Sequence, residues 1–189
     1  MKNKLLTYAE KVEIGGKEYA INTDFSVWIE IEQQLIYSGG DYAQRLAKVL
    51  SLAYPVLPEN PQGAIEKLLW FYSLGKEVEN KESDLISCPA FDLAEDFEYI
   101  RAGFLSEFGI DLSKEDMHWW QFRKMLSCLS EDSKFSKIVA YRTTDTAKIK
   151  DPETKRFFQK MKKKYKLKDM RTPTQRESEI AFKLETLFS

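Results

Sequence analysis

The chain has 189 residues, of which 43% are hydrophobic and 31% charged, a composition that supports a folded core and excludes a disordered chain. Its two cysteines, Cys88 and Cys128, exclude the disulfide scaffold of a small secreted protein, and its apolar runs are too short for a signal peptide or a membrane span. The net charge is −1, but residues 1–110 carry 10 Lys+Arg against 18 Asp+Glu, and residues 111–189 carry 19 against 12. This asymmetry fits an acidic partner, head-to-tail contact between copies, or an ordinary solvated surface.

The N-terminal half begins with a predicted β-hairpin, because apolar and polar residues alternate over residues 12–21 on both sides of Gly15-Gly16. Three helices follow, with N-cap candidates at residues 22–24 and at Asp41 and a proline-rich bend before the third. Their predicted apolar sides are Phe25, Trp28, Ile29, Leu35 and Ile36, then Tyr42, Leu46, Val49, Leu50 and Ala53, then Ile65, Leu68, Leu69 and Tyr72.

A polar and charged segment over residues 76–89 follows Gly75 and ends at Pro89, and we interpret it as a linker. The linker would join a subdomain of residues 1–75, which holds the hairpin and the first helices, to a helical subdomain of residues 90–189. Each half is then a separate unit that packs closely against the other.

The C-terminal half opens with a predicted capping box, in which Asp92 accepts an amide hydrogen bond and Glu95 reaches back to the Asp92 amide. Its helix should end at Gly109, since glycine suits the position after a helix. The apolar stripe of this helix is Leu93, Phe97, Ile100, Phe104 and Phe108.

Later helices are predicted to start near Ser113 with Asp116, after a turn at residues 130–133, at Asp151-Pro152 and at Thr172-Pro173. Their inward-facing residues are expected to be Trp119, Phe122, Leu126 and Leu129, then Phe135, Ile138 and Val139, then Phe157, Phe158, Met161 and Tyr165, then Ile180, Leu184, Leu187 and Phe188. The chain is therefore predicted to be mainly α, a helical bundle-like protein of about eight helices with a small N-terminal β-hairpin.

No residue pattern predicts catalysis, a metal site or a cofactor site. His118 is the only histidine, no glycine-flanked serine accompanies it, and zinc would need about four clustered ligands. The acidic residues Asp92, Glu95, Asp96 and Glu98 fall mostly in a helix's first turns, where negative charge stabilises the helix dipole. We expect a protein that is not an enzyme and that holds neither a metal nor a cofactor.

The most basic stretch, residues 148–176, holds twelve Lys+Arg against three acidic residues. A patch that includes Lys162, Lys163 and Lys166 could neutralise phosphates, and this predicts salt-dependent nucleic-acid binding as an alternative function. Binding of single strands usually adds several exposed aromatic residues. Here the aromatic residues instead have the spacing of a helix's buried side.

The Trp119-Trp120 pair is unusual, because neighbours on a helix point about 100° apart and cannot share one narrow stripe. Trp119 lines up with Phe122, so Trp120 must cover a second contact. Either the helix is buried on two sides, or Trp120 is an exposed anchor for a partner, a role in which tryptophan is enriched. The candidate partner-binding residues are Trp120, Trp119, Phe122 and Arg123.

Three segments of the second half, residues 104–112, 118–123 and 126–135, resemble a phage family. The sequence is similar to the bacteriophage "gene product fifteen" family of Gram-positive siphophages and prophages, closely over residues 90–145 and more loosely before them. The His-Trp-Trp-x-Phe-Arg motif and the following Leu-Ser-Glu-Asp carry the resemblance. The chain departs from the family pattern at Cys128, where a small residue such as glycine often stands.

The resemblance implies a tail assembly chaperone that coats the tape-measure protein in the cytoplasm of the bacterial host before the tail tube polymerises. It brings no catalytic residues with it. The implied partners are the tape-measure protein and possible further tail proteins, with no membrane. The charge asymmetry could also support self-association along such a client. The alternative that the residues leave open is a nucleic-acid-binding phage accessory protein that uses residues 148–176.

Overall fold

A computed structural model describes residues 8–36, 41–76 and 90–168. These residues form seven helices and one two-stranded antiparallel sheet, which confirms the predicted mainly α protein with an N-terminal hairpin. Residues 77–89 of the predicted linker and the helix predicted after Thr172 lie outside the described residues. None of the helices that the structure describes combines the length and the apolar character needed to cross a membrane.

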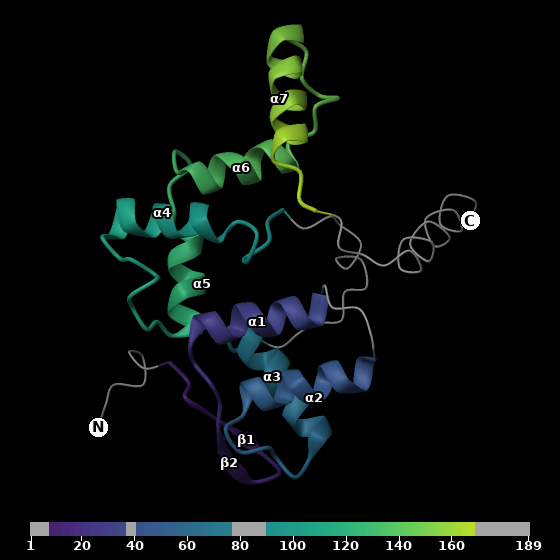
Figure 1. The fold of residues 1–189 in the computed structure, drawn as a ribbon, viewed down its shortest axis with the longest axis vertical. Helices are drawn as coiled ribbons and strands as arrows, with labels where there is room; N and C mark the ends of the chain where they lie inside the picture. The colour runs from purple at the N-terminus through teal and green to yellow at the C-terminus, as the bar shows by residue number, and fades with distance from the viewer. Residues whose placement is uncertain (1–7, 37–40, 77–89, 169–189) are drawn as a thin grey trace, which may run out of the picture.

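The hairpin and the first three helices gather at one end of the molecule (Figure 1). Asp41 and Asn60 cap the second and third helices through their side chains. Three side chains expected on inward faces are instead exposed, Leu35 by 43%, Tyr42 by 67% and Leu69 by 42%. The elements are β1 (Lys11–Ile14), β2 (Lys17–Ala20), α1 (Phe25–Ile36), α2 (Tyr42–Ala53) and α3 (Pro61–Tyr72).

The other four helices extend from this end in one direction (Figure 1). Helix α5 stands between α1 and α4, α6 packs on α4, and α7 projects beyond α6 at the far end of the molecule. The elements are α4 (Phe97–Phe108), α5 (Trp119–Ser127), α6 (Lys134–Thr143) and α7 (Pro152–Lys164).

The hairpin turns at Gly15 and Gly16, whose φ values of 59° and 77° are costly for residues with a side chain. Alternation places Val12 and Ile14 on the buried face of β1. Ile14 then lies directly on α3 at Gly63, where a Cβ atom would stand only 2.7 Å from Ile14 Cγ2. Glycine in the first turn of α3 therefore allows the close approach of the hairpin.

The core combines residues from both sides of the segment 77–89. Trp28 of α1 stacks on Phe71 of α3 with ring centroids 4.9 Å apart and on Trp119 of α5 at 6.0 Å. Phe25 stacks on Phe122 at 4.8 Å. The two halves that we predicted as subdomains therefore share one apolar interior.

The capping box before α4 differs from its prediction. Asp92 Oδ1 accepts the amides of Ala94 at 2.8 Å and Glu95 at 2.7 Å, but the Asp92 amide donates to Asp96 Oδ2 at 3.1 Å and not to Glu95. Asp96 is 1% exposed, and its carboxylate is held in place by an ion pair with Arg142. The reciprocal bond from the Asp92 amide thus goes to the buried Asp96 carboxylate, whereas the exposed Glu95 accepts the Lys168 amide at 3.2 Å.

Helix α5 begins at Trp119, several residues after the start predicted near Ser113. The Phe25 amide donates to Met117 O at 3.0 Å, and the Trp119 amide donates to Thr23 O at 2.6 Å. An extended bridge therefore joins this segment to the chain just before α1. Because the bridge occupies these backbone groups, the helix can start only after it.

Helix α7 contradicts the predicted burial of its apolar side. Phe158, Met161 and Tyr165 are only partly buried, and Phe157 is 47% exposed. The reason is that α6 is the main described element packed on α7, and one neighbouring helix covers only part of an apolar side. The predicted exposure of Lys162, Lys163 and Lys166 is confirmed.

Candidate partner-binding site

The two adjacent tryptophans both reach the C-terminal end of α3. Trp119 Nε1 donates to Tyr72 O at 3.2 Å, and Trp120 Nε1 donates to Phe71 O at 2.8 Å. The last carbonyls of a helix lack partners within the helix itself. The Trp119-Trp120 pair supplies donors to two successive carbonyls in the last turn of α3, and this explains why two tryptophans stand side by side.

Trp120 is half-buried, in contrast to Trp119 and Phe122, which are fully buried. Its ring lies edge-on to Trp70 at 5.5 Å between centroids. It also covers Gly75, where φ is +78° and a Cβ would stand 2.9 Å from the indole. The fully buried Trp119 and Phe122 offer no surface to a partner in this conformation, while binding through Trp120 stays a prediction.

His118 caps α5. Its Nδ1 accepts the Trp120 amide at 3.0 Å, and its Nε2 lies 3.0 Å from Ala9 O. Because a backbone amide can only donate, the proton of the neutral ring is on Nε2 and points to the Ala9 carbonyl. Burial lowers the pKa of His118 below its usual value. The histidine thus has a structural role that requires the neutral ring.

Arg123 is the charged member of the predicted partner-binding set, and its side chain lines a hollow on the surface. Its guanidinium stacks over Trp119 at 5.1 Å and over Tyr72 at 5.9 Å. Nη1 also lies 4.0 Å from Glu32 Oε2, and the side chain remains 28% exposed. Burial raises the pKa of Glu32, which accepts a hydrogen bond from the Tyr72 hydroxyl.

A hollow of about 340 Å³ opens beside Arg123, between α5 and α6. Its walls are mostly apolar and carry one cationic group, the composition typical of a site that takes an apolar side chain and orients it. We call it the α5–α6 hollow, and it is lined by Phe91, Arg123, Leu126, Ser127, Phe135, Ser136 and Val139.

The sequence pattern places Leu126, Phe135 and Val139 on inward-facing stripes and associates none of them with a site. Leu126 and Phe135 are indeed largely buried, by side chains on two helices that leave a space between them. Periodicity predicts which face of each helix is apolar, but not how well two such faces fill the space between them. No pattern in the sequence marks this hollow.

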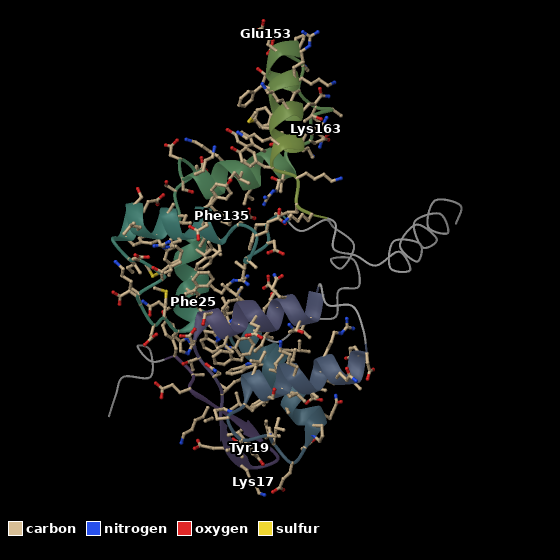
Figure 2. All side chains as sticks on the ribbon, viewed as in Figure 1. Lys17, Tyr19, Phe25, Phe135, Glu153 and Lys163 are labelled. Atoms are coloured by element: carbon tan, nitrogen blue, oxygen red, sulfur yellow. The ribbon has the colours of Figure 1, made fainter. Side chains whose placement is uncertain are left out.

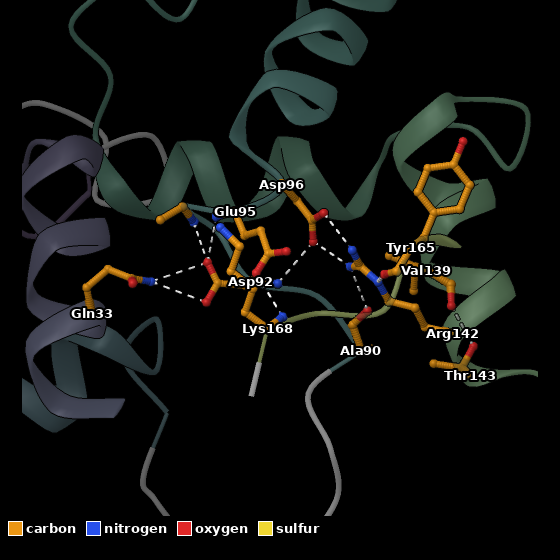
Figure 3. Close-up of polar contacts among 11 residues, drawn as sticks. Gln33, Ala90, Asp92, Glu95, Asp96, Val139, Arg142, Thr143, Tyr165 and Lys168 are labelled. Atoms are coloured by element: carbon orange, nitrogen blue, oxygen red, sulfur yellow. Dashed lines mark hydrogen bonds and ion pairs between the residues drawn. The ribbon is translucent and has the colours of Figure 1, made fainter. Parts of the chain in front are cut away.

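The basic segment is attached to the body by a buried polar network (Figure 3). Arg142 pairs with Asp96 through both terminal nitrogens, with Nη2 at 2.9 Å from Oδ1, while its Nε donates to Tyr165 O at 2.6 Å. On the other side, Gln33 of α1 donates to Asp92 at 3.3 Å. The network joins α1, the start of α4, the end of α6 and the end of α7, so the direction of α7 is set by buried groups.

The surface of α7 combines positive charge with one exposed aromatic residue. Phe157 is 47% exposed, and Lys160, Lys163 and Lys164 are exposed around it. Tyr141 of α6 contacts the rings of both Phe157 and Phe158 at 5.8 Å. Proteins that bind single-stranded nucleic acids usually expose several aromatic rings on which bases stack, whereas α7 exposes one.

Residues 3–167 match the family model described as Bacteriophage Gp15 protein. The chain belongs to this phage family. The match confirms the resemblance found in the motifs of residues 104–135 and extends it over the hairpin and all described helices. No curated protein and no solved structure matches the chain. The fold and the α5–α6 hollow of this Gp15-family chain are therefore described from its own residues.

Proposed function

We propose that this protein assists phage tail assembly by binding the tape-measure protein as a chaperone does, in the cytoplasm of the bacterial host. Membership of the phage family supports a role in phage biology. The role is one of binding, without catalysis or a cofactor. Its specific form is a groove that accepts apolar side chains of an amphipathic helix.

The observation that carries this proposal is the α5–α6 hollow. Its volume of about 340 Å³ accommodates a leucine or phenylalanine side chain, and its lining is mostly apolar. An amphipathic client helix presents such a side chain every three or four residues. Each copy of the protein would hold one anchor, and many copies along a long client would add their modest affinities through avidity.

Arg123 gives the hollow a charge preference. Its guanidinium lines the hollow and its side chain is 28% exposed, so a carboxylate of the client could pair with it. A client helix with an acidic residue one turn away from its apolar anchor would fit both parts of the site. The preference is for an acidic amphipathic helix.

The test is co-expression with the tape-measure protein of the same phage or prophage. We expect the two proteins to purify together and the soluble yield of the tape-measure protein to rise. Ser127→Phe should fill the hollow and weaken the complex by about tenfold or more, as the loss of an anchor contact does. Absence of a complex with the wild-type chain would overturn the proposed function.

Ser51→Phe provides the matched control. Ser51 and Ser127 are both exposed helix residues whose hydroxyls donate to the carbonyl three residues earlier, at 2.8 Å and 2.7 Å. Both variants add the same ring to a helix surface, but only Ser127 lines the hollow. Equal binding by the two variants would place the client elsewhere and leave the function standing.

The nucleic-acid alternative predicts a different result. If Lys162, Lys163 and Lys166 contact phosphates, duplex or single-stranded DNA should bind with an affinity that falls steeply with salt. Replacement of these three exposed lysines by glutamate should then abolish binding. Under the tape-measure proposal, we expect no tight DNA binding at physiological salt and a complex with the client that survives these replacements.

A further inference from the structure

The end of the molecule opposite α7 exposes two large aliphatic side chains. The loop between α2 and α3 carries Val56, which is 72% exposed, and Leu57, which is 57% exposed. Pro55 and Pro58 flank this pair and restrict the backbone. The preceding Tyr54 is buried. The loop is therefore held at its base and presents the two side chains to solvent, and we call Val56 and Leu57 the loop face.

The loop face lies beside the hairpin turn. Lys17 Nζ pairs with Glu59 at 3.1 Å, which places the loop next to the tip of the hairpin. Figure 2 shows Lys17 at one end of the molecule and Glu153 of α7 at the other. The loop face and α7 are thus separated by most of the length of the molecule.

The second exposed apolar site is on α7. Phe157 is 47% exposed, and Lys160 and Lys164 follow it at helical spacings of three and seven residues, on the same edge of the helix. We call Phe157 with these two lysines the arm face. Arg142 holds the carbonyl of Tyr165 at the end of α7, and the helix that carries the arm face projects from the body (Figure 1).

The two ends carry opposite charge. Residues 148–168, which include α7, hold ten Lys+Arg against two Asp+Glu, a net of +8. Residues 8–76, which hold the hairpin, the first three helices and the loop face, carry six Lys+Arg against nine Asp+Glu, a net of −3. Opposite net charge of the two ends favours contact between them and disfavours contact of either end with itself.

We propose that the protein associates head to tail, with the arm face of one copy seated on the loop face of the next. The two faces of one copy cannot meet, because they lie at opposite ends of its long axis. Each contact therefore leaves a free loop face and a free arm face at the ends of the pair. Such heterologous contacts lead to a ring if the rotation closes, or to an open chain if it does not.

The first experiment is sedimentation velocity of the full chain from about 1 μM to about 500 μM, a range that covers weak protein contacts. The average mass should rise beyond that of a dimer with increasing concentration. The rise should be smaller at high salt, because screening weakens the attraction between the charged ends. A monomer at every concentration, or an association that stops at a dimer, would overturn the proposal.

Two variants then separate the faces. Phe157→Ser removes the apolar contact of the arm face, and the double change Val56→Ser with Leu57→Ser removes that of the loop face. Each variant alone should be monomeric. An equimolar mixture should form a discrete dimer, because one intact arm face and one intact loop face remain and no further contact can follow.

Leu105→Ser is the control, since Leu105 is 51% exposed but lies on α4, away from both ends. It should associate as the wild-type chain does. Because all four altered side chains are exposed, circular dichroism and thermal unfolding should show a folded protein in each case. A mixture of the two monomeric variants that stays monomeric would contradict the head-to-tail geometry. The outcome is independent of tape-measure binding through the α5–α6 hollow.

Discussion

Two aromatic clusters of this protein differ in how far they are exposed to solvent. At the junction of α1, α3 and α5, Trp28 stacks on both Phe71 and Trp119, and all three are fully buried. On α6 and α7, Tyr141, Phe157 and Phe158 also contact one another, yet all of them keep some exposure to solvent. Both clusters are held together by contacts between rings, but only the first is buried.

The difference comes from the number of elements that surround each cluster. Trp119 has helices on more than one side and a hydrogen-bond acceptor for its indole N–H at Tyr72 O. Among the described elements, α6 is the main neighbour of Phe157, and lysines follow Phe157 on the exposed edge of α7. Aromatic residues therefore stabilise the fold in the first region, whereas in the second they remain available for contacts with another molecule.

The largest expected effect is at Trp119. Trp119→Ala should lower the free energy of unfolding by about 3–5 kcal/mol, because it empties a fully buried site and frees the Tyr72 carbonyl. Phe157→Ala, in the exposed cluster, should lower it by only about 1 kcal/mol, because the ring is 47% exposed and loses only its contacts with Tyr141 and Phe158. Urea unfolding followed by circular dichroism measures both. Similar losses for the two variants would remove the distinction between the clusters.

The second effect concerns the attachment of α7. Arg142→Met should cost about 3 kcal/mol or more, since it leaves the Asp96 carboxylate buried without its ion pair. Adding Asp96→Asn should restore part of the loss, because the amide is neutral and its oxygen can still accept the Asp92 amide. Unfolding curves of the two variants test this, and equal stabilities would show that the loss comes from packing alone.

A smaller effect, of unusual sign, is expected at Gly63. Replacing glycine by alanine inside a helix usually stabilises a protein by up to about 1 kcal/mol. Here Gly63→Ala should destabilise by about 1 kcal/mol, because its Cβ would stand 2.7 Å from Ile14 Cγ2. In an Ile14→Ala background that atom is gone and only the Asn60 side chain, with Nδ2 at 3.1 Å, stays close to the new Cβ, so the same change should cost less. Thermal unfolding of the wild type, Gly63→Ala, Ile14→Ala and the double variant measures the effect of Gly63→Ala in each background.

The smallest effect is the acid sensitivity of His118. Its pKa is lower in the folded chain than in the unfolded one, so the unfolded state binds the proton more readily and stability falls as the pH drops through about 6.5. His118→Asn keeps an acceptor for the Trp120 amide but does not titrate. We expect the wild type to lose more stability than this variant between pH 7.5 and 5.5. Parallel losses in urea titrations would contradict the role of the neutral ring.

Local sequence determined several parts of the fold. Gly15-Gly16 accepts the positive φ of a hairpin turn, and Asp41 and Asp151 carry side-chain oxygens that cap the helices after them. These features depend on atoms within a few residues of one another, and their conformations are therefore encoded locally. The motif around Trp119-Trp120 likewise indicates the family through residue identities alone, and the family match confirms it.

Tertiary structure alone decided the rest. The bridge between Asp24 and His118 delays the start of α5, and Arg142 holds the Asp96 carboxylate that takes the place of Glu95 as acceptor of the Asp92 amide. Both results depend on partners 46 or more positions away in the chain, beyond the reach of periodicity. The exposure of Phe157 has the same origin. Sequence predicts that a helix has an apolar side, but whether another element covers that side depends on how the whole chain packs.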